Sequence, residues 1–407
     1  MNATSLVAPV WIWFRVRTLL PTVVVLLIVP VLLLGTGCGG SSSSPGSSLP
    51  PPPPRARVYA GQGQPFGVDF NRDGKPDVLT SDGTMNLGSG NGTFHAATHV
   101  ALPAGFELDA VADFNGDGKP DLLARNCLYL FPCTTLSVFL GNGDGTFQTT
   151  PVSTTATLER LAAGDLNGDG KADVVAASNG TLFVYLSNGD GTFEFTGTYN
   201  SGFSDGSVGS SGVALGDFNG DGKTDVVVTT TGDFYSRGQV IVFLGNGDGT
   251  FQAPKASIGA YGNGSIAMED FNGDGKLDLV MSGVDLIAGS VEWVQFGNGD
   301  GTFQTPNFFG PVGDPLDGIA QIAAGDFRGD GKKDLALQAG SIFNNHAEIY
   351  LGNGDGTFTH GNDYTPGGPS TQISPFGITI ADFNGDGKLD IAVANSVLLG
   401  KGDGTFQ

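Results

Sequence analysis

The chain has 407 residues, with 19 Lys and Arg against 41 Asp and Glu, so its formal net charge is −22. Because contacts to phosphate need Lys and Arg, this balance excludes nucleic acid as an expected partner. A hydrophobic fraction of 39% and 28 Phe exclude a chain that is disordered throughout.

The N-terminus has the pattern of an export signal. Arg15 and Arg17 precede the uncharged run 19–34, LLPTVVVLLIVPVLLL. A basic segment followed by about 16 apolar residues fits a signal sequence, and it is shorter than the about 20 residues that span a membrane. The run leads through small residues to Cys38, which resembles the bacterial lipobox, although Gly35 stands where that motif usually has Leu.

We therefore predict a signal peptide over 1–38 with lipidation at Cys38. The alternatives are a plain signal peptide with an incidental Cys and an uncleaved anchor. Residues 39–54 (GGSSSSPGSSLPPPPP) form a flexible segment and then a stiff polyproline spacer, as a tethered domain needs. We expect an exported protein of the cell envelope, an outward-facing lipoprotein held to the membrane through its N-terminal lipid.

Residues 55–407 form the expected folded domain, in which two coupled motifs occur seven times. The first motif is the nonapeptide Asp69–Asp77 (DFNRDGKPD), and its later copies begin at Asp113, Asp165, Asp217, Asp270, Asp326 and Asp382. The second is Leu140–Phe147 (LGNGDGTF), whose equivalents end at Phe94, Phe193, Phe251, Phe303, Phe358 and Phe406. Seven coupled pairs of motifs indicate a repeat architecture.

Each copy has room for four short strands. In the fourth copy these are Val213–Phe218, Asp225–Thr230, Gln239–Leu244 and a strand that starts at Phe251, with the turn Asn246–Gly249 before the last. Asn and Gly favour such a tight turn because they tolerate positive φ. Copies of 44 to 56 residues with four strands each predict an all-β fold, a seven-bladed β-propeller. A β-solenoid, the alternative, would have shorter and more uniform rungs.

The segment Arg55–Ala60 (RARVYA) precedes the first nonapeptide and has the place of a spare strand. The sequence stops at Gln407, where the fourth strand of the last blade should begin. We predict that 55–60 pairs in the seventh blade as its outer strand, which would close the ring and remove an open edge.

Two further cysteines, Cys127 and Cys133, flank the segment LYLFP in the second copy. Because disulfides persist in exported proteins, we predict a disulfide between them. Two free thiols are the alternative, and the lack of a second Cys/His cluster disfavours a metal site.

The nonapeptide D-x-N-x-D-G-x-x-D is predicted to bind calcium. Side-chain oxygens stand at positions one, three, five and nine. Position seven is a Lys, which can offer its backbone carbonyl while its ammonium points to solvent. Hard oxygen donors favour calcium over zinc or copper, and magnesium comes second because it demands stricter octahedral geometry. The alternative is an Asp/Asn/Gly turn that binds nothing.

The expected ligands follow the motif through all seven copies. At positions one, three, five, seven and nine they are Asp69, Asn71, Asp73, Lys75 and Asp77; Asp113, Asn115, Asp117, Lys119 and Asp121; Asp165, Asn167, Asp169, Lys171 and Asp173; Asp217, Asn219, Asp221, Lys223 and Asp225; Asp270, Asn272, Asp274, Lys276 and Asp278; Asp326, Asp330, Lys332 and Asp334; and Asp382, Asn384, Asp386, Lys388 and Asp390. Copy six has Arg328 at position three, which replaces an oxygen ligand by a cation. We expect up to seven Ca²⁺, with the weakest site, or none, at Asp326–Asp334.

These motifs resemble FG-GAP or VCBS-type repeats, the family of the integrin α-chain seven-bladed propeller, and the GNGDGTF variant resembles its bacterial branch. The resemblance implies calcium in the loop between strands one and two of a blade. It also implies that a ligand meets the opposite face, on the loops that join strands two to three and four to one.

Signals for an enzyme are poor. His95, His99, His346 and His360 have no metal-ligand spacing. The G-x-S-x-G of 202–206 lies in a Gly/Ser-rich loop rather than between a strand and a helix, where a nucleophile elbow would be. We therefore expect no catalytic residues.

The expected role is a cell-surface binding or adhesion module for a protein or a glycan. The alternatives are the propeller of a polysaccharide-active enzyme and a purely structural calcium-stabilised shell. The segments that differ most between copies are Asn200–Ser211, Cys127–Cys133, Thr229–Arg237, Phe308–Asp317 and Gly361–Ser374. Their candidate ligand-contacting aromatics are Tyr129, Phe131, Phe203, Phe234, Tyr235 and Tyr364.

Overall fold

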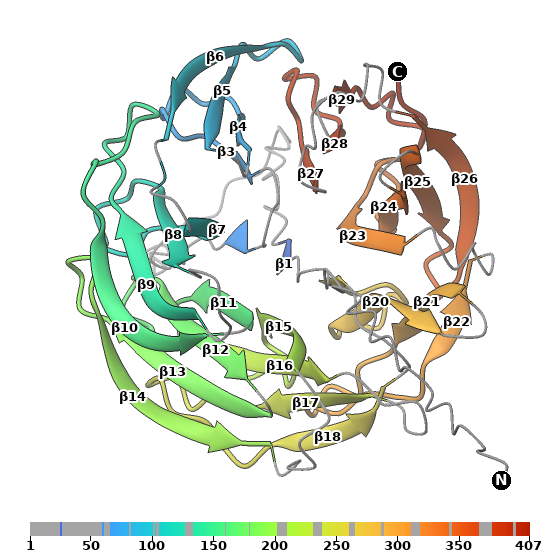
Figure 1. Cartoon of the computed structure of the whole chain (residues 1–407). Coiled ribbons are helices and arrows are strands. Elements are labelled where there is room, and N and C mark those ends of the chain that lie inside the picture. The colour runs from blue at the N-terminus through green and yellow to red at the C-terminus, as the bar shows by residue number, and fades with distance from the viewer. Residues whose placement is uncertain are drawn as a thin grey trace, which may run out of the picture.

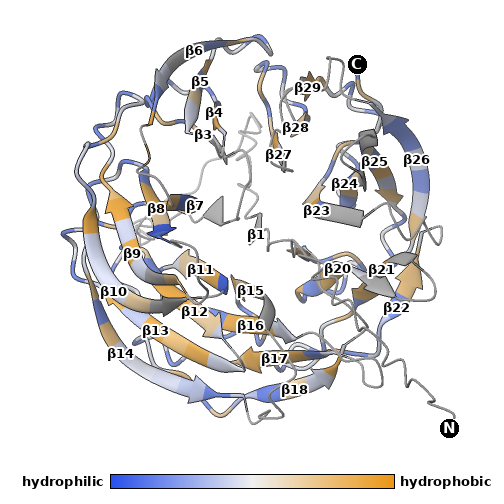
Figure 2. Ribbon diagram, in the orientation of Figure 1, coloured by the Kyte–Doolittle hydropathy of each residue, from blue (hydrophilic) through white to orange (hydrophobic). Residues whose placement is uncertain are grey.

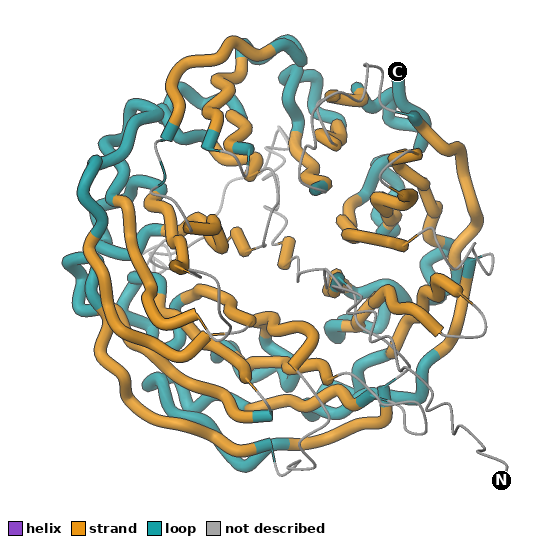
Figure 3. Tube along the Cα trace, in the orientation of Figure 1, coloured by secondary structure: helices purple, strands orange, loops and turns teal. Residues whose placement is uncertain are grey.

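The structure is a computed structural model, and it describes most of the repeat domain. The described residues are 25–26, 59–60, 66–80, 83–100, 102, 106–126, 133–158, 160–178, 180–201, 210–230, 238–259, 265–285, 289–310, 318–341, 344–365, 377–393 and 396–407. Within these ranges the chain forms strands and turns (Figure 3). No helix in them is long and apolar enough to cross a membrane.

Seven antiparallel sheets stand around a central opening like the blades of a propeller (Figure 1). Within each blade the strands follow one another in chain order from the inside of the ring to the outside. The predicted all-β fold, a seven-bladed β-propeller, is therefore confirmed.

Blades one to four have four strands each, β3 to β18. Blade one has β3 (Phe66–Val68), β4 (Asp77–Leu79), β5 (Thr84–Gly88) and β6 (Phe94–His99). Blade two has β7 (Phe106–Ala112), β8 (Asp121–Asn126), β9 (Cys133–Phe139) and β10 (Val152–Leu158). Blade three has β11 (Arg160–Gly164), β12 (Asp173–Ser178), β13 (Thr181–Ser187) and β14 (Phe193–Asn200). Blade four has β15 (Ser210–Gly216), β16 (Asp225–Thr230), β17 (Gln239–Phe243) and β18 (Lys255–Ile258).

The last three blades complete the ring. Blade five has β19 (Ile266–Glu269), β20 (Asp278–Asp285), β21 (Gly289–Gln295) and β22 (Asn307–Phe309). Blade six has β23 (Gly318–Gly325), β24 (Asp334–Ser341), β25 (Asn344–Gly352) and β26 (Phe358–Tyr364). Blade seven has three strands among the described residues, β27 (Ile378–Ala381), β28 (Asp390–Val393) and β29 (Ser396–Leu398).

The core lies between neighbouring blades. The second strands are β-branched runs such as DVVVTT in β16, which is buried at every position because a blade packs on both of its faces. Between blades three and four, Val175, Val213, Val226 and Ile241 belong to one buried cluster. The outer strands β14 and β18 alternate toward solvent. Figure 2 shows β14 mainly in pale and hydrophilic colours and β18 in both hydrophilic and hydrophobic ones.

The prediction for the N-terminal strand is wrong. Within 55–60 the structure describes Tyr59–Ala60 (β2), which pairs with Val111 and Ala110 of β7, the innermost strand of blade two. On its other side β2 pairs with β1 (Val25–Leu26). The inner edge of β7, where β2 pairs, faces the central opening (Figure 1). Beyond β29, by contrast, Leu399 already exchanges two backbone hydrogen bonds of 3.0 Å with Gln407.

The ring closes by the same contacts that join the other blades. The Gly92 N–H of blade one donates to the Phe383 carbonyl of blade seven at 3.1 Å. The rings of Phe94 and Phe383 meet edge to face with centroids 5.5 Å apart, and Val78 and Ala392 pack with Phe383 in one buried cluster. Closure therefore needs no strand exchanged between the two ends of the chain.

Candidate metal-binding loops

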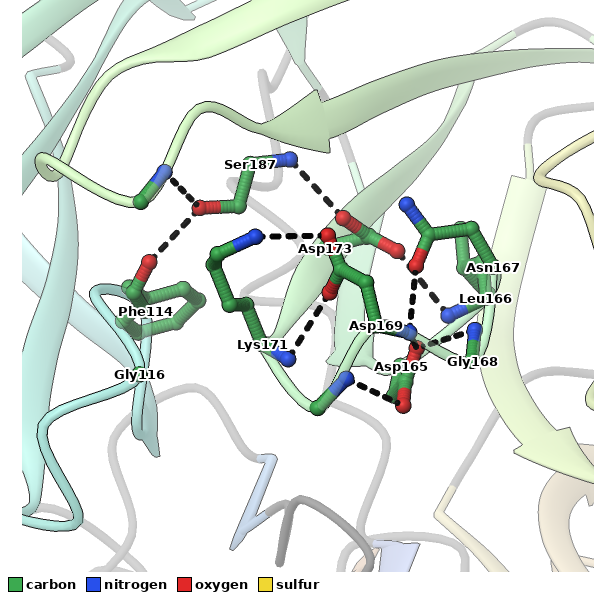
Figure 4. A network of polar contacts seen from close by, with 12 residues as sticks. Phe114, Gly116, Asp165, Leu166, Asn167, Gly168, Asp169, Lys171, Asp173 and Ser187 are labelled. Carbon is green, nitrogen blue, oxygen red and sulfur yellow. Dashed lines mark hydrogen bonds and ion pairs between the residues drawn. The ribbon is translucent and has the colours of Figure 1, made fainter.

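Each nonapeptide forms the loop between the first and second strands of its blade, as predicted. In blade three the loop follows β11 and ends where β12 begins at Asp173 (Figure 4). At position six Gly170 has φ +85°, a conformation that costs Gly little and lets the chain turn back toward Asp165.

The Asp at position nine joins three strands of its blade. Asp173 is completely buried. Its Oδ2 accepts the Leu166 N–H at 2.9 Å and its Oδ1 accepts the Ser187 N–H at 2.8 Å (Figure 4). All seven copies make both bonds, through Asp77, Asp121, Asp173, Asp225, Asp278, Asp334 and Asp390. This predicted ligand is thus also a structural link between the loop and the end of the third strand.

The other side-chain oxygens accept hydrogen bonds from the loop's own backbone. Asp165 Oδ1 accepts the N–H groups of Gly168 and Asp169 at 2.6 and 3.2 Å, and its Oδ2 accepts that of Gly170 at 3.0 Å. Asn167 Oδ1 accepts the Asp169 N–H at 3.0 Å. The loop is therefore ordered by its own side chains at positions one and three.

The Lys at position seven turns back to the loop, contrary to the expectation that its ammonium points to solvent. Lys171 Nζ lies 2.7 Å from Asp169 Oδ2 (Figure 4). The same ion pair of positions seven and five occurs at 2.9–3.6 Å in copies one, two, four, five and seven. The lysine stem also covers the second motif, because a Cβ added to Gly189 would lie 2.9 Å from Lys171 Cε.

Negative charge is concentrated in each loop. Burial raises the pKa of the Asp173 carboxyl to about 7, and the charges of Asp169 and Asp165 add to that rise against the lowering effect of its hydrogen bonds. The pKa of Asp121 is raised to about 7 in the same way. Carboxylates at positions one, five and nine are therefore close enough to repel one another.

These residues fit a hard cation by the chemistry of their oxygen donors. Among the described residues, no three His, Cys, Asp or Glu side chains are arranged to hold one metal ion. Each loop nevertheless supplies three carboxylates and, in six copies, an amide oxygen, the donors that calcium prefers. A carboxylate oxygen that accepts one N–H keeps a second acceptor direction.

Copy six has a different internal cation. Arg328 Nη2 donates to Asp334 Oδ1 at 2.7 Å and to the Gly352 carbonyl at 2.5 Å, while its Nε donates to Asp334 Oδ2 at 3.3 Å. Its Nη1 lies 3.5 Å from Asp330 Oδ2. The guanidinium thus binds the carboxylates of positions five and nine directly.

The second motif forms the turn between the third and fourth strands. In blade two Asp144 Oδ1 accepts the N–H of Thr146 at 2.9 Å and its hydroxyl at 2.5 Å. The next residue, Gly145, donates its N–H to the Phe70 carbonyl of blade one at 3.2 Å. The Asp of this motif therefore closes a turn, and the glycine after it binds the nonapeptide of the preceding blade.

Aromatic pairs link the two motifs around the ring. The ring at position two of one nonapeptide meets the last Phe of the neighbouring turn edge to face, with centroids 5.3–5.9 Å apart. The pairs are Phe70–Phe147, Phe94–Phe383, Phe114–Phe193, Phe218–Phe303, Phe271–Phe358 and Phe327–Phe406. At the remaining interface Leu166 takes the place of the first ring and packs in one cluster with Phe251.

Comparison with known sequences supports the repeat assignment. Six segments match the FG-GAP-like repeat: residues 69–124, 113–176, 165–228, 217–281, 270–337 and 339–393. The chain belongs to the FG-GAP-like repeat family. A search of curated proteins finds no match to it.

Several solved structures are similar to this FG-GAP repeat chain. One is a lectin of Agrocybe aegerita described as recognising non-reducing terminal N-acetylglucosamine, at 21% identity and TM-score 0.58, over 87% of this chain and 92% of the lectin. The Dos1 propeller matches at 11% identity and TM-score 0.46, over 87% and 81% of the two chains. A rhamnogalacturonan lyase of Bacillus licheniformis matches at 16% identity and TM-score 0.33, over 81% and 60%. At 21% identity the likeness to the lectin concerns the fold alone.

The remaining sequence predictions fall mostly on segments that the structure does not describe. Cys133 is disulfide-bonded, while Cys127 and Cys38 lie outside the described residues, so the predicted pairing and lipidation stay predictions. The G-x-S-x-G of 202–206 and five of the six candidate aromatics also lie outside them. The sixth, Tyr364, belongs to β26, where its hydroxyl accepts the Phe406 N–H at 2.9 Å and its ring packs on Phe406. This aromatic links two blades.

A polar cluster between blades five and six of the FG-GAP propeller was not predicted. Glu292 of β21 is 2% exposed. From β25, His346 Nε2 and the Tyr350 hydroxyl contact the two carboxylate oxygens of Glu348 at 3.1 and 3.3 Å. Burial and the charge of Glu348 raise the pKa of Glu292 to about 8. The alternation of His346, Glu348 and Tyr350 on one strand face was the available signal, but which blade they face becomes clear only in the fold.

The substitution Asp173→Asn tests the structural role of position nine. It replaces one accepting oxygen by an amide N–H₂ that faces a backbone N–H, so we expect the free energy of unfolding to fall by about 1–3 kcal/mol. Urea unfolding in chelator measures the change without a metal contribution. The control is Asp169→Asn, where an exposed oxygen can still accept the Lys171 N–H, and a change within about 0.5 kcal/mol is expected. Equal losses in the two variants would contradict the role.

The substitution Glu292→Gln tests the buried carboxyl. The pKa of Glu292 is about 8 in the fold and about 4.3 in an unfolded chain. Between these values the folded state binds more protons, so stability falls as pH rises through this window and is not regained above it. At pH 9 the free energy of unfolding of the variant should therefore exceed that of the wild type by about 1 kcal/mol or more. Near pH 4 the two free energies should match. Urea unfolding of both proteins from pH 4 to pH 9 measures this difference. Equal stability of the two proteins at pH 9 would contradict the raised pKa of Glu292.

Proposed function

We propose that this FG-GAP propeller is an exported, lipid-anchored protein that binds calcium in its loops. The observation that carries the proposal is the set of loops itself: all seven blades carry the position-one, position-five and position-nine Asp at the same junction of strands one and two. Repeated exposed carboxylates repel one another unless a cation lies among them.

Calcium would be held by the side-chain oxygens of positions one, three, five and nine and by the carbonyl of position seven. The ion supplies positive charge where three carboxylates meet. The chain's own groups order the loop: Asp173 fixes its end to β13, and the amides that bind Asp165 set its curvature. Sites of this kind in extracellular modules bind in the range of about 10⁻⁴–10⁻³ M.

The proposal for export rests on the leader, tether and Cys38 in the sequence. A calcium affinity in this range suits an exterior with millimolar calcium rather than a compartment that keeps calcium low. Lipidation at Cys38 and the spacer of 39–54 would place the propeller beside the membrane with free access to its environment.

The proposed role at the surface is binding of a protein or a glycan by the loops that join strands two to three and four to one. The similarity of fold to a lectin that recognises N-acetylglucosamine supports testing glycans first. The loops concerned differ between copies, unlike the two motifs, as expected where specificity varies on a constant scaffold. The proposal assigns no catalytic activity to the chain.

Calcium binding is tested by equilibrium dialysis of the purified chain with radioactive calcium. We expect six bound ions, because copy six lacks an oxygen at position three. At a calcium concentration ten times the dissociation constant, each site should stabilise the fold by about 1.4 kcal/mol. Chelation should therefore lower the melting temperature and increase cleavage by protease. Magnesium at equal ionic strength is the control, and unchanged protease resistance in chelator would contradict the proposal.

The surface role is tested with cells that express the full chain. Radioactive palmitate should label the wild type and not Cys38→Ser, and the variant should leave the membrane fraction. The purified propeller, applied to a glycan array and to envelope proteins with and without calcium, should retain at least one class of ligand. If the protein takes up palmitate and calcium but binds neither a glycan nor an envelope protein, the result favours the purely structural alternative.

A further inference from the structure

Copy six has its own cation where the other copies are proposed to hold calcium. Arg328 occupies position three, and its side chain is 21% exposed. It forms a two-bond contact with the position-nine carboxylate of Asp334 and lies 3.5 Å from the position-five carboxylate of Asp330. A third contact reaches the Gly352 carbonyl, on the residue whose N–H donates to Asp334 Oδ1. One cation thus touches two predicted ligands and the turn behind them.

The guanidinium also takes over the role that lysine has elsewhere. In the other six copies the ion pair at position five is made by the lysine of position seven. In copy six the cation beside Asp330 is Arg328. Burial raises the pKa of Asp334, and the hydrogen bond and positive charge of Arg328 offset part of that rise.

The rest of the loop keeps the form of the other copies. Asp326 Oδ1 and Oδ2 accept the N–H groups of Asp330 and Gly331 at 3.1 and 2.7 Å. Asp334 accepts the Phe327 N–H at 3.1 Å and the Gly352 N–H at 2.8 Å. These bonds of positions one and nine match those of the other copies. The bond that an Asn at position three accepts from the position-five N–H elsewhere has no counterpart here, because a guanidinium has no acceptor. Arg328 adds its own bonds to Asp334 and Gly352 instead, so it is more than a substitution that spoils a site.

We propose that Arg328 is a built-in substitute for calcium, which keeps the loop of blade six ordered without metal and excludes divalent cations from it. This inference rests on the proposed binding of calcium by the other six loops. A guanidinium suits the task because it is always charged and its planar fork matches a carboxylate with two parallel bonds. Because it is part of the chain, it is present at any calcium concentration. Blade six would remain ordered when chelation loosens its neighbours.

A reciprocal exchange between copies five and six tests the proposal in the full chain. Arg328→Asn gives copy six the oxygen that it lacks, and Asn272→Arg gives copy five the cation. Equilibrium dialysis counts the calcium ions bound. Hydrogen exchange of the amides in 270–278 and 326–334, with and without chelator, reports the order of each loop separately.

For the wild type we expect six ions, protection of 270–278 that falls in chelator, and protection of 326–334 that does not. Arg328→Asn should bind seven ions, and exchange in 326–334 should become about tenfold or more faster in chelator, because a charged two-bond contact is lost. Asn272→Arg should bind five ions and make the protection of 270–278 independent of calcium. Thermal unfolding in calcium checks that both variants fold.

Each other outcome has a definite meaning. Two results would overturn the proposal that Arg328 substitutes for calcium while leaving the proposed calcium function intact. The first is that the wild type and Arg328→Asn both bind six ions. The second is that residues 326–334 of the wild type lose protection in chelator as residues 270–278 do. A wild type that binds no calcium overturns the proposed function, and with it the idea that Arg328 replaces the ion. If Arg328→Asn fails to fold, Asn272→Arg decides: six ions bound to it would overturn the proposal.

Discussion

The buried carboxylate at position nine of each nonapeptide is the contact on which the other features of the blade depend. It accepts one N–H from the start of the loop and one from the end of the third strand, so it fixes strands one, two and three together. Those bonds bring the lysine of position seven over the glycine of the following turn. The two motifs recur together because each provides the contact surface of the other.

The same turn carries order from one blade to the next. The last glycine of the turn donates its N–H to the carbonyl of nonapeptide position two in the preceding blade, as Gly301 does to Phe218. The Phe that ends the turn, here Phe303, packs on the ring of the same Phe218. A Cβ at Gly301 would lie 2.8 Å from Leu244 of that blade, which explains why Gly is required there. Because blade seven meets blade one through an identical contact, the ring closes by repetition of one interface.

The repeats made most of the fold predictable, since motif spacing and β-branched runs determine seven units of antiparallel strands. Contacts between distant residues were not predictable in the same way. The dual role of Asp173 depends on Ser187, which lies in another element, and the cluster at Glu292 depends on which faces of blades five and six meet. The predicted pairing of the N-terminal strand was wrong because a short extended segment can pair with any free strand edge. The sequence did not show that the inner edge of β7 is such an edge.

The excess of Asp in the composition therefore has two physical origins. The position-nine carboxylates are buried and bound by backbone amides, so they contribute to the fold whether or not a metal is present. Those of positions one and five remain at the surface, where they order the loop and repel one another. A cation placed among them would relieve that repulsion without having to create the loop. Calcium is thus expected to strengthen blades that already have their form, and to act blade by blade, since the side-chain oxygens of each loop bond to that loop's own backbone and to its own turn.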